Sequence, residues 1–196
     1  KKHFISLKKE VFRKTIHICT AFVPLFIHFY KIPAIICLVC AAVLYSISEI
    51  LRLKGVCVPL ISSITVAAAR KRDDNKFVLG PVTLVLGIVL CSILWKEPFS
   101  TVGIFSLAFG DGLASLAGKT FGRVEVPLTG GKTAAGSLTC FAAVFISSFF
   151  VLDNSVLCFF LALVATLIEV LPLKDYDNVL IPVVIGGLSQ LFYLHM

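Results

Sequence analysis

Hydrophobic residues follow one another in long runs along this chain, and polar residues are confined largely to the segments between the runs. Seven runs approach the roughly 17–25 residues that a bilayer-spanning helix needs, and they cover 15–30, 32–48, 77–95, 98–118, 133–152, 155–173 and 179–194. An eighth run, 56–69, is shorter and is expected to be an interfacial or re-entrant segment. The pattern predicts an all-α, polytopic membrane protein with about seven transmembrane helices, folded as a single domain over 1–196.

The composition agrees with this pattern. Hydrophobic residues make up 58% of the chain, against about 45–50% in soluble domains, and the mean hydropathy is +0.99. The first run follows a basic start, as a signal peptide does, but no small-residue cleavage site follows it, so we expect a true span. All cysteines fall within apolar runs, including the pair Cys37-x-x-Cys40, and are expected to be small hydrophobic residues rather than metal ligands.

The basic residues predict the orientation of the spans. If 56–69 does not cross the membrane, every one of the 18 Lys and Arg residues except Lys31 and Lys96 falls on the same side as the N-terminus. By the positive-inside rule, this side is the cytosol. The net charge of +7 is then explained by topology rather than by a nucleic-acid partner. The expected location is a bacterial inner membrane or an equivalent cytosol-facing membrane.

Acidic and basic side chains from distant parts of the chain approach this basic side. Asp111 interrupts the fourth run about 18 Å from the outer end of its helix, and Glu169 lies late in the sixth run. Arg13, Lys14 and His17 begin the first run. Ionisable groups inside spans are costly and usually functional, although Asp111 could instead be a buried structural partner of Arg13 or Lys14. The loops expected to complete a site are 70–76, 119–132 and 174–178.

Glycines are concentrated next to Asp111. The stretch GLASLAGKT at 112–120 and the Gly-Lys-Thr at 131–133 both lack the spacing of a P-loop. The spacing of Ala114, Gly118 and Gly122 favours close packing of helices, but it does not explain the basic residues that follow. A glycine-rich loop with Lys, Arg and free backbone N–H groups suits a polyphosphate, and nearby carboxylates suit the Mg²⁺ that accompanies it.

Several motifs occur in a distinctive order: EVFRKTIHI at 10–18, GDGLASLAGKTFGR at 110–123, GGKTAAGS at 130–137, and Glu169 followed by DYDN and Pro182. This order resembles the dolichol kinase, phytol kinase and CTP-dependent diacylglycerol kinase family, which is related to CDP-diacylglycerol synthase. The resemblance implies a membrane enzyme that transfers phosphate from CTP to a lipid alcohol. The residues that match positions needed for activity in that family are Arg13, Lys14, Asp111 and Gly118.

The sequence also departs from relatives in the family. Dolichol kinases are much longer, which disfavours dolichol as the substrate. The cytidylyltransferases carry a His-Gly-Gly signature near their C-terminal end, and the last third of this chain contains only KDYDN at 174–178.

The resemblance and the residue chemistry together suggest roles. We expect Asp111 to hold Mg²⁺ or orient the lipid hydroxyl, while Arg13 and Lys14 neutralise transferring charge. His17 is a candidate base, although a role in helix packing is the favoured interpretation. The expected nucleotide-binding residues are Gly110, Gly118, Lys119, Gly122, Arg123, Gly131, Lys132, Thr133 and Asn178. The expected ligands of the Mg²⁺ cofactor are Asp111, Glu169, Asp175 and Asp177.

The predicted function is therefore a CTP-dependent lipid kinase whose partners are CTP, the bilayer and a lipid alcohol: diacylglycerol, phytol or polyprenol. One alternative is a phosphatidate cytidylyltransferase, which would release pyrophosphate rather than CDP. A second is a small transporter, which would need polar groups through the full depth of the bilayer. The outer halves of the apolar runs hold almost none.

Overall fold

The structure, a computed structural model, describes residues 2–56, 76–127 and 129–193. Its helical elements are α1 (Lys2–Cys19), the 3₁₀ turn η1 (Thr20–Phe22), α2 (Val23–Leu53), α4 (Gly80–Leu94), α5 (Phe99–Phe105), the π-helical segment η3 (Ser106–Asp111), α6 (Gly112–Phe121), α7 (Ala134–Leu152), α8 (Ser155–Val170) and α9 (Asp177–Tyr193). Within the described ranges, β structure is limited to one isolated bridge between Glu125 and Thr133. The all-α prediction is confirmed for these residues.

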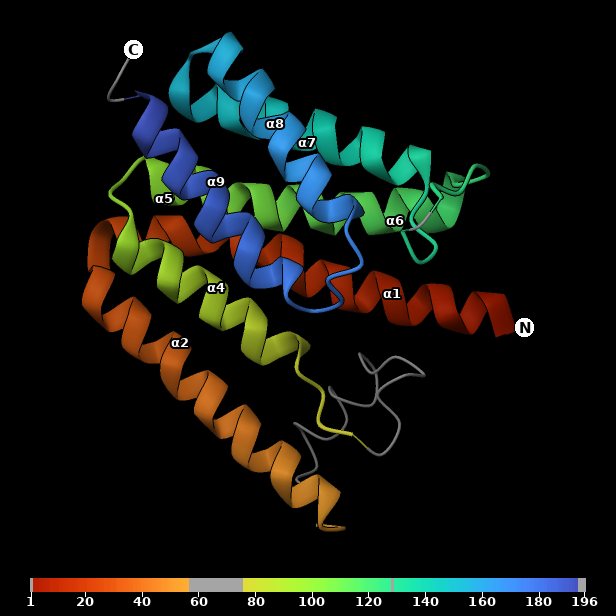
Figure 1. The fold of residues 1–196 in the computed structure, drawn as a ribbon. Coiled ribbons are helices and arrows are strands. Elements are labelled where there is room, and N and C mark those ends of the chain that lie inside the picture. The colour runs from red at the N-terminus through yellow and green to blue at the C-terminus, as the bar shows by residue number, and fades with distance from the viewer. Residues whose placement is uncertain (1, 57–75, 128, 194–196) are drawn as a thin grey trace.

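The first two predicted spans are joined without a loop. α1, η1 and the start of α2 continue in one direction, and the chain then turns back at Tyr30, whose φ of −141° and ψ of 61° are non-helical (Figure 1). Pro33 falls in the first turn after this break, where a missing N–H costs no helical hydrogen bond. The helix begins at Lys2, well before the apolar run at 15–30, and Glu10 on this extension contacts Ser115 and Lys119 of α6.

The number of spans is supported only in part. In the described ranges, three helical segments are long and apolar enough to cross a membrane: the kinked Leu7–Leu53, then Phe99–Phe121 and Ala134–Leu152. The other apolar helices, α4, α8 and α9, have 15, 16 and 17 residues. Seven spans therefore stay a prediction, as does the single domain over 1–196. Residues 57–69 of the predicted re-entrant segment lie outside the described residues.

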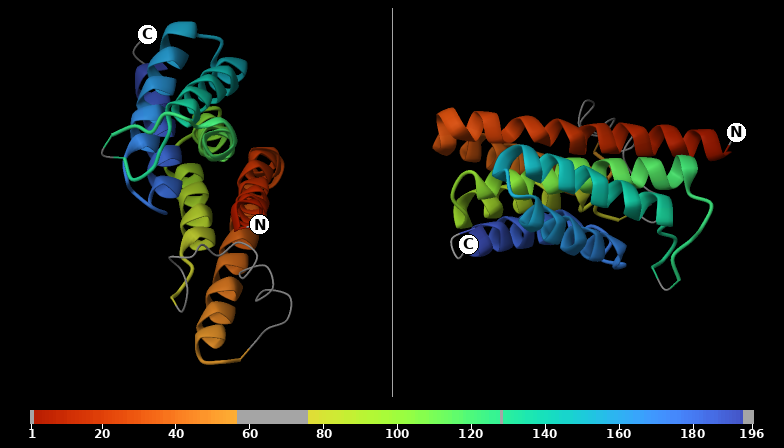
Figure 2. Two further views of the ribbon diagram at one scale, coloured as in Figure 1. Left: turned by 90° about the vertical axis from the view of Figure 1, so that its right-hand side faces the viewer. Right: turned by 90° about the horizontal axis from the view of Figure 1, so that it is seen from above.

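A continuous rod made of α5, η3 and α6 lies at the centre of the bundle (Figure 2). Val102, Ile104 and Leu107 on this rod are fully buried in the hydrophobic core. α7 packs along the whole rod and in turn on α8, while α9 packs on α4, α5 and α8. α1 lies along η3 and α6. The middle of the rod, which carries Asp111, is thus next to Lys14 and His17 on the second half of α1.

Glycines allow two of these helices to approach closely. A Cβ added at Gly87 of α4 would lie 2.1 Å from the backbone oxygen of Asn178 at the start of α9. A Cβ at Gly103 of α5 would lie 2.3 Å from the backbone oxygen of Pro182, farther along α9. Since backbone atoms cannot move aside cheaply, only glycine fits at these crossings. They hold the first half of α9 against α4 and α5.

Candidate active site

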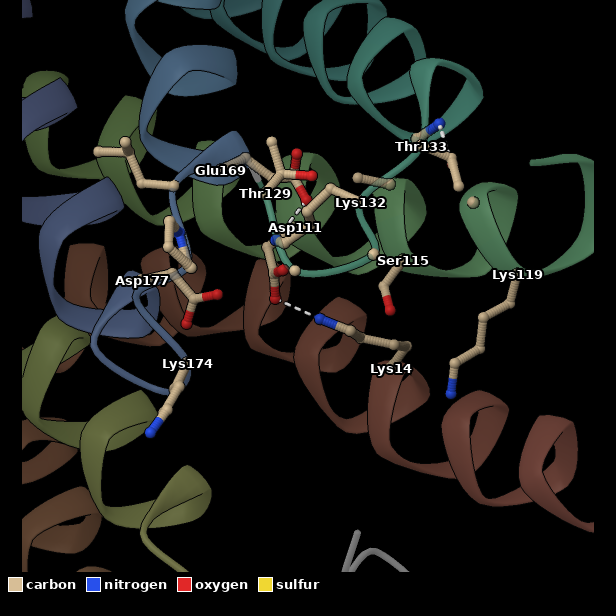
Figure 3. A pocket seen from close by; sticks show the side chains of 17 residues that line it. Lys14, Asp111, Ser115, Lys119, Thr129, Lys132, Thr133, Glu169, Lys174 and Asp177 are labelled. Carbon is tan, nitrogen blue, oxygen red and sulfur yellow. Dashed lines mark hydrogen bonds and ion pairs between the residues drawn. The ribbon is translucent and has the colours of Figure 1, made fainter. Parts of the chain in front are cut away.

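A pocket of about 420 Å³ opens where α1, α6, the loop before α7 and the α8–α9 connection meet. This volume is within the roughly 300–1,000 Å³ typical of small-molecule sites. Side chains from all four parts of the chain point into it (Figure 3). The lining residues are Lys14, Asp111, Ala114, Ser115, Gly118, Lys119, Thr129, Gly130, Gly131, Lys132, Thr133, Gly136, Glu169, Leu171, Pro172, Lys174 and Asp177.

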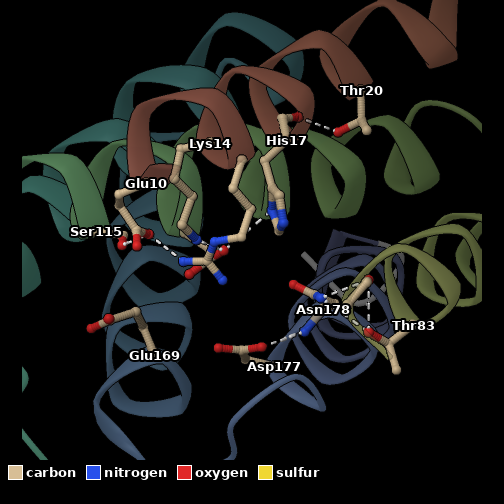
Figure 4. Close-up of polar contacts among 12 residues, drawn as sticks. Glu10, Lys14, His17, Thr20, Thr83, Ser115, Glu169, Asp177 and Asn178 are labelled. Atoms are coloured by element: carbon tan, nitrogen blue, oxygen red, sulfur yellow. Dashed lines mark hydrogen bonds and ion pairs between the residues drawn. The ribbon is translucent and has the colours of Figure 1, made fainter. Parts of the chain in front are cut away.

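Asp111 forms a buried ion pair with Lys14 at the inner end of this pocket. The lysine is 2% exposed and the aspartate 4%, and the Lys14 ammonium donates to Oδ2 of Asp111. Nδ1 of His17 lies 3.2 Å from the same oxygen, without the alignment of a hydrogen bond, and this nitrogen has no other partner. Figure 4 shows His17 and Lys14 on the same side of α1. Arg13 and Lys14 are the two expected structural partners of Asp111, and the structure pairs Asp111 with Lys14.

A second ion pair joins the loop before α7 to α8. Nζ of Lys132 donates to Oε1 of Glu169 at 2.6 Å. Burial by itself would lower the pKa of Lys132, but the neighbouring Glu169 carboxylate outweighs burial, so the pKa lies above its usual range. The other carboxylate oxygen of Glu169, Oε2, is buried and has no hydrogen-bond partner. Glu169 therefore has an unused acceptor in a site that also holds cations.

Asp177 brings a third carboxylate to the pocket from the first residue of α9. Burial raises its pKa to about 7, and the negative charge of Asp111 adds to the rise. One of its oxygens, Oδ1, accepts the backbone N–H of Asn178 at 2.9 Å. A cation bound nearby would favour the charged form of this carboxylate.

The carboxylates of the pocket suit Mg²⁺ only when a bound phosphate supplies further oxygen ligands. Within the described residues, no three His, Cys, Asp or Glu side chains are close enough together to hold a metal by themselves. Mg²⁺ commonly takes one or two carboxylates and completes its shell with water and phosphate oxygens. The unpaired oxygen of Glu169 and the carboxylate of Asp177 fit this pattern.

A glycine turn forms another wall of the pocket. Gly130 and Gly131 have φ values of 72° and 97°, which favour glycine over other residues. The turn is closed by backbone hydrogen bonds from Val126 N–H to Lys132 O at 2.8 Å and from Ala134 N–H to Val124 O at 3.0 Å. It places Lys132 next to Glu169.

Close packing of α6 against α7 forms the wall beside this turn. A Cβ at Gly136 would lie 2.9 Å from the backbone oxygen of Ala114, and a Cβ at Gly118 would lie 2.9 Å from Oγ1 of Thr133. Thr133 also caps α7, because its hydroxyl accepts the backbone N–H of Gly136 at 3.2 Å. The small residues at 114 and 118 thus do allow close packing, and they also line the pocket.

The structure brings many of the predicted site residues together. Those that line the pocket are Lys14, Asp111, Gly118, Lys119, Gly131, Lys132, Thr133, Glu169 and Asp177. Arg13 and His17 do not line it but lie next to residues that do.

Other predicted residues lie elsewhere. The amide of Asn178 donates to Oγ1 of Thr83 at 3.0 Å and to the backbone oxygen of Gly80 at 3.3 Å, so it holds α9 on α4 (Figure 4). Gly110 packs towards Val144 within the bundle. The predicted ligands that do not line the pocket are Gly110, Gly122, Arg123, Asp175 and Asn178.

Some pocket residues lie outside the set of individual residues predicted for the site. Ser115 lies inside a quoted motif, and Thr129 and Gly130 lie in the expected site loop 119–132, but nothing in a sequence shows which side of a helix or turn faces a pocket. Lys174 begins the KDYDN segment and lines the pocket with a positive φ of 61°. Its position just before Asp175 and Asp177 is the sequence feature that could have indicated a place in the site.

Comparison with known proteins bears on the family. The chain is 30% identical to a probable phytol kinase 1, chloroplastic, of Glycine max over 156 residues, which are 69% of this chain and 50% of that protein. It is 31% identical to phytol kinase 1, chloroplastic, of Arabidopsis thaliana over 143 residues, 63% of this chain and 45% of that protein. The predicted resemblance to the phytol kinase family is confirmed.

A third relative extends this similarity. Farnesol kinase, chloroplastic, of Arabidopsis thaliana is 34% identical over 82 residues, which are 41% of this chain and 27% of that protein. The chain spans about half the length, or less, of these curated relatives. No protein-family model and no solved structure matches the chain.

The predicted location is wrong. A bacterial inner membrane was expected from the basic residues, but the relatives are plant proteins described as chloroplastic. The distribution of Lys and Arg reports only on which face of a membrane a loop occupies, and it holds no information about which membrane that is.

Proposed function

We propose that this chain belongs to a membrane enzyme that transfers the terminal phosphate of CTP to an isoprenoid alcohol. The observation that carries the proposal is the single pocket in which the Lys14–Asp111 and Lys132–Glu169 pairs lie beside the glycine turn at 129–131. The similarity to phytol and farnesol kinases supports an alcohol of that class over diacylglycerol. It also favours a kinase over a cytidylyltransferase.

The cations of the pocket suit a triphosphate. Lys14, Lys119 and Lys132 come from three different elements and all line the same space. Phosphoryl transfer depends mainly on positioning and on neutralising the charge of the phosphate oxygens, and this chemistry needs such cations. Lys132 would exchange its Glu169 partner for a phosphate oxygen, while Lys14 and Lys119 would contact phosphate from their pairs with Asp111 and Glu10. The backbone N–H groups of the glycine turn are further candidate donors.

The displaced carboxylate of Glu169 would then hold the metal together with Asp177. Glu169 and Asp177 are its best-placed ligands, because Glu169 has an unpaired oxygen and Asp177 is held at the pocket by α9. Mg²⁺ bound there would neutralise charge on the terminal phosphates. Asp175 does not line the pocket and is not needed in this arrangement.

Asp111 and His17 suit the alcohol. In the transfer, the hydroxyl oxygen bonds to the terminal phosphorus, the bond from that phosphorus to the bridging oxygen breaks, and CDP leaves. The hydroxyl proton needs an acceptor within hydrogen-bond reach. The candidates are the carboxylate of Asp111 and the unpaired Nδ1 of His17, which lie 3.2 Å apart. Lys14 holds Asp111 in place between the phosphates and α1.

Two further features rest on likeness alone. The choice of CTP comes from the family resemblance, since no described contact selects cytosine. A chloroplast membrane is the location that the relatives support.

The test is a direct assay. Purified protein in nanodiscs is incubated with Mg²⁺, CTP labelled in its terminal phosphate, and phytol, farnesol, a polyprenol, diacylglycerol or phosphatidate. We expect label in phytyl or farnesyl monophosphate, with CDP as the coproduct and much less product from ATP. Equal use of ATP would refute the choice of CTP. Release of pyrophosphate with phosphatidate as acceptor would establish a cytidylyltransferase instead.

A further inference from the structure

A buried carboxylate that does not line the pocket contacts two side chains that do. Glu10 lies on α1, one turn before Lys14, and is 4% exposed. Its Oε1 accepts the hydroxyl of Ser115 at 2.6 Å and the guanidinium of Arg13, while its Oε2 accepts the ammonium of Lys119. Figure 4 shows Glu10 and Ser115 facing each other across the α1–α6 contact.

These contacts bring the Arg13 guanidinium and the Lys119 ammonium together at Glu10, beside the part of the pocket that is proposed to bind phosphate. Ser115 and Lys119 are one turn apart on α6, and both line the pocket. Arg13 precedes Lys14, whose ammonium is already in the pocket. Without a carboxylate between them, the Arg13 and Lys119 charges would repel each other, and their long side chains would adopt many conformations.

We propose that Glu10 is a positioning residue for phosphoryl transfer. Its carboxylate holds the Lys119 ammonium and the Arg13 guanidinium in a fixed arrangement before nucleotide binds. The proposal rests on the proposed function, because it assumes that phosphate occupies the adjacent pocket. Preset charges stabilise a transition state better than mobile ones do, since no reorganisation is needed during reaction.

Glu49 offers a matched comparison on another helix. It is 1% exposed and pairs with Arg52 three residues on, as Glu10 does with Arg13. Its third contact is the backbone N–H of Val78 at 2.9 Å. Neither Glu49 nor any of these partners lines the pocket. A purely structural role predicts similar consequences for loss of either carboxylate.

The experiment compares Glu10→Gln with Glu49→Gln. Glutamine keeps the volume but presents an NH₂ group to donors, so it cannot accept from all three partners of Glu10. We expect Glu10→Gln to lower kcat by about 10- to 100-fold in the fully folded fraction, as small misplacements of reacting groups do. The KM for nucleotide should change by less than about threefold, because the lost negative charge also strengthens attraction of phosphate. Glu49→Gln should keep the kcat of its folded fraction.

A variant that conserves the negative charge tests whether the carboxylate itself is what is needed. Glu10→Asp keeps the carboxylate, and the long side chains of Arg13 and Lys119 can follow its shorter reach, so most of the kcat should return. Wild-type kcat in Glu10→Gln, or an equal loss of kcat in Glu49→Gln, would overturn the proposal. Failure of Glu10→Asp to restore more kcat than Glu10→Gln would overturn it as well.

A readout without catalysis separates this proposal from the function on which it rests. Acylation of Lys119 by an amine-reactive reagent is followed by mass spectrometry, with Lys174 as a second pocket lysine for reference. Release from Glu10 should raise the rate at Lys119 by several-fold in Glu10→Gln and leave Lys174 unchanged. Equal rates at Lys119 in both proteins would overturn positioning by Glu10. If instead the wild-type protein phosphorylates no alcohol while Lys119 still responds, the proposed function fails and restraint of Lys119 by Glu10 stands.

Discussion

At the residue scale, Asp111 is the side chain whose role most needs to be separated from its contribution to folding. Its pair with Lys14 is buried, and breaking such a pair by removing one partner costs about 3–5 kcal/mol. A simple loss of activity in Asp111→Asn would therefore have two explanations. Neutralising both partners leaves no unpaired buried charge. Any loss of turnover that remains is then due to the missing chemical groups and not to misfolding.

We predict that Asp111→Asn lowers both the thermal midpoint and the turnover, with turnover falling by about 10²-fold or more. The double variant Lys14→Met/Asp111→Asn should recover the thermal midpoint, because no buried charge is left unpaired. Its turnover should stay low. Both quantities are measured on protein in the same detergent. Recovery of turnover in the double variant would show that the pair is only structural.

Glu169 leads to a second prediction, about linkage between metal and nucleotide. With Lys132 paired to Glu169, neither the cation nor the carboxylate is fully available until both ligands arrive. In Glu169→Gln, we expect Mg²⁺-free CTP to bind more tightly and Mg²⁺·CTP more weakly. The coupling between the two ligands should fall by about tenfold, which is within the 5- to 150-fold range of typical couplings.

Calorimetric titration with CTP, with and without Mg²⁺, measures this coupling. Asp175→Asn is the matched control, because its carboxylate does not line the pocket, and it should bind both forms as the wild-type protein does. If Glu169→Gln left the ratio of the two dissociation constants unchanged, Glu169 would not be a ligand of the metal.

At the element scale, the crossing of α4 and α9 aims Asp177 at the pocket. Gly87→Ala would place a methyl group 2.1 Å from the backbone oxygen of Asn178, the residue after Asp177. Overpacking of this kind usually costs about 1–3 kcal/mol. We therefore expect a lower thermal midpoint and weaker binding of Mg²⁺·CTP.

Gly80→Ala on the same helix is the control for this change. Its Cβ would meet only Oδ1 of Asp175, at 4.0 Å, and it should be close to wild type in both measurements. Equal behaviour of the two variants would mean that the α4–α9 crossing does not control the site.

Helices were predictable from the sequence where hydrophobicity decides them, and less so where packing does. The break near Tyr30 follows from the polar step between two apolar runs, and it is observed. The extension of α1 to Lys2 lies outside the apolar run, and Glu10 on this extension is held by Ser115 and Lys119 of α6 and by Arg13, contacts that the sequence does not show. Likewise, a sequence could place Asp111 near either Arg13 or Lys14, and the rotation of α1 against η3 selects Lys14.

The sequence was enough to predict several acidic and basic residues of the pocket, but not which neighbouring polar residues lie outside it. Ionisable residues in apolar runs must find partners, so Asp111 and Glu169 could be singled out from burial cost alone. Asn178 and Arg123 are polar residues at segment ends, where no such cost applies. The structure places the Asn178 amide against Thr83 and leaves Arg123 exposed in the loop before α7.

At the scale of the whole molecule, the polar features separate towards two ends of the bundle. The pocket lies beside Lys14 of α1, with α6 and the α8–α9 connection (Figure 1). The turn at Tyr30, the α4–α5 connection and the α7–α8 connection lie towards the other end. There, His28 contacts Glu97 at 2.8 Å, which brings the start of α2 next to the α4–α5 connection.

This arrangement makes a topology prediction that does not depend on the function. In a cysteine-free background reconstituted into sealed vesicles, single cysteines at positions 76, 123 and 176 should react with a membrane-impermeant thiol reagent from one side. Cysteines at positions 31, 96 and 154 should react from the opposite side. The physical reason is that each connection between long apolar helices must reach water at one face, since unpaired backbone groups are not tolerated in the hydrocarbon. Position 123 follows the helix that carries Asp111 and Lys119, so its reaction from the same side as position 96 would place the pocket on the opposite face from the basic loops. That result would refute both the seven-span topology and the use of the basic residues to orient it.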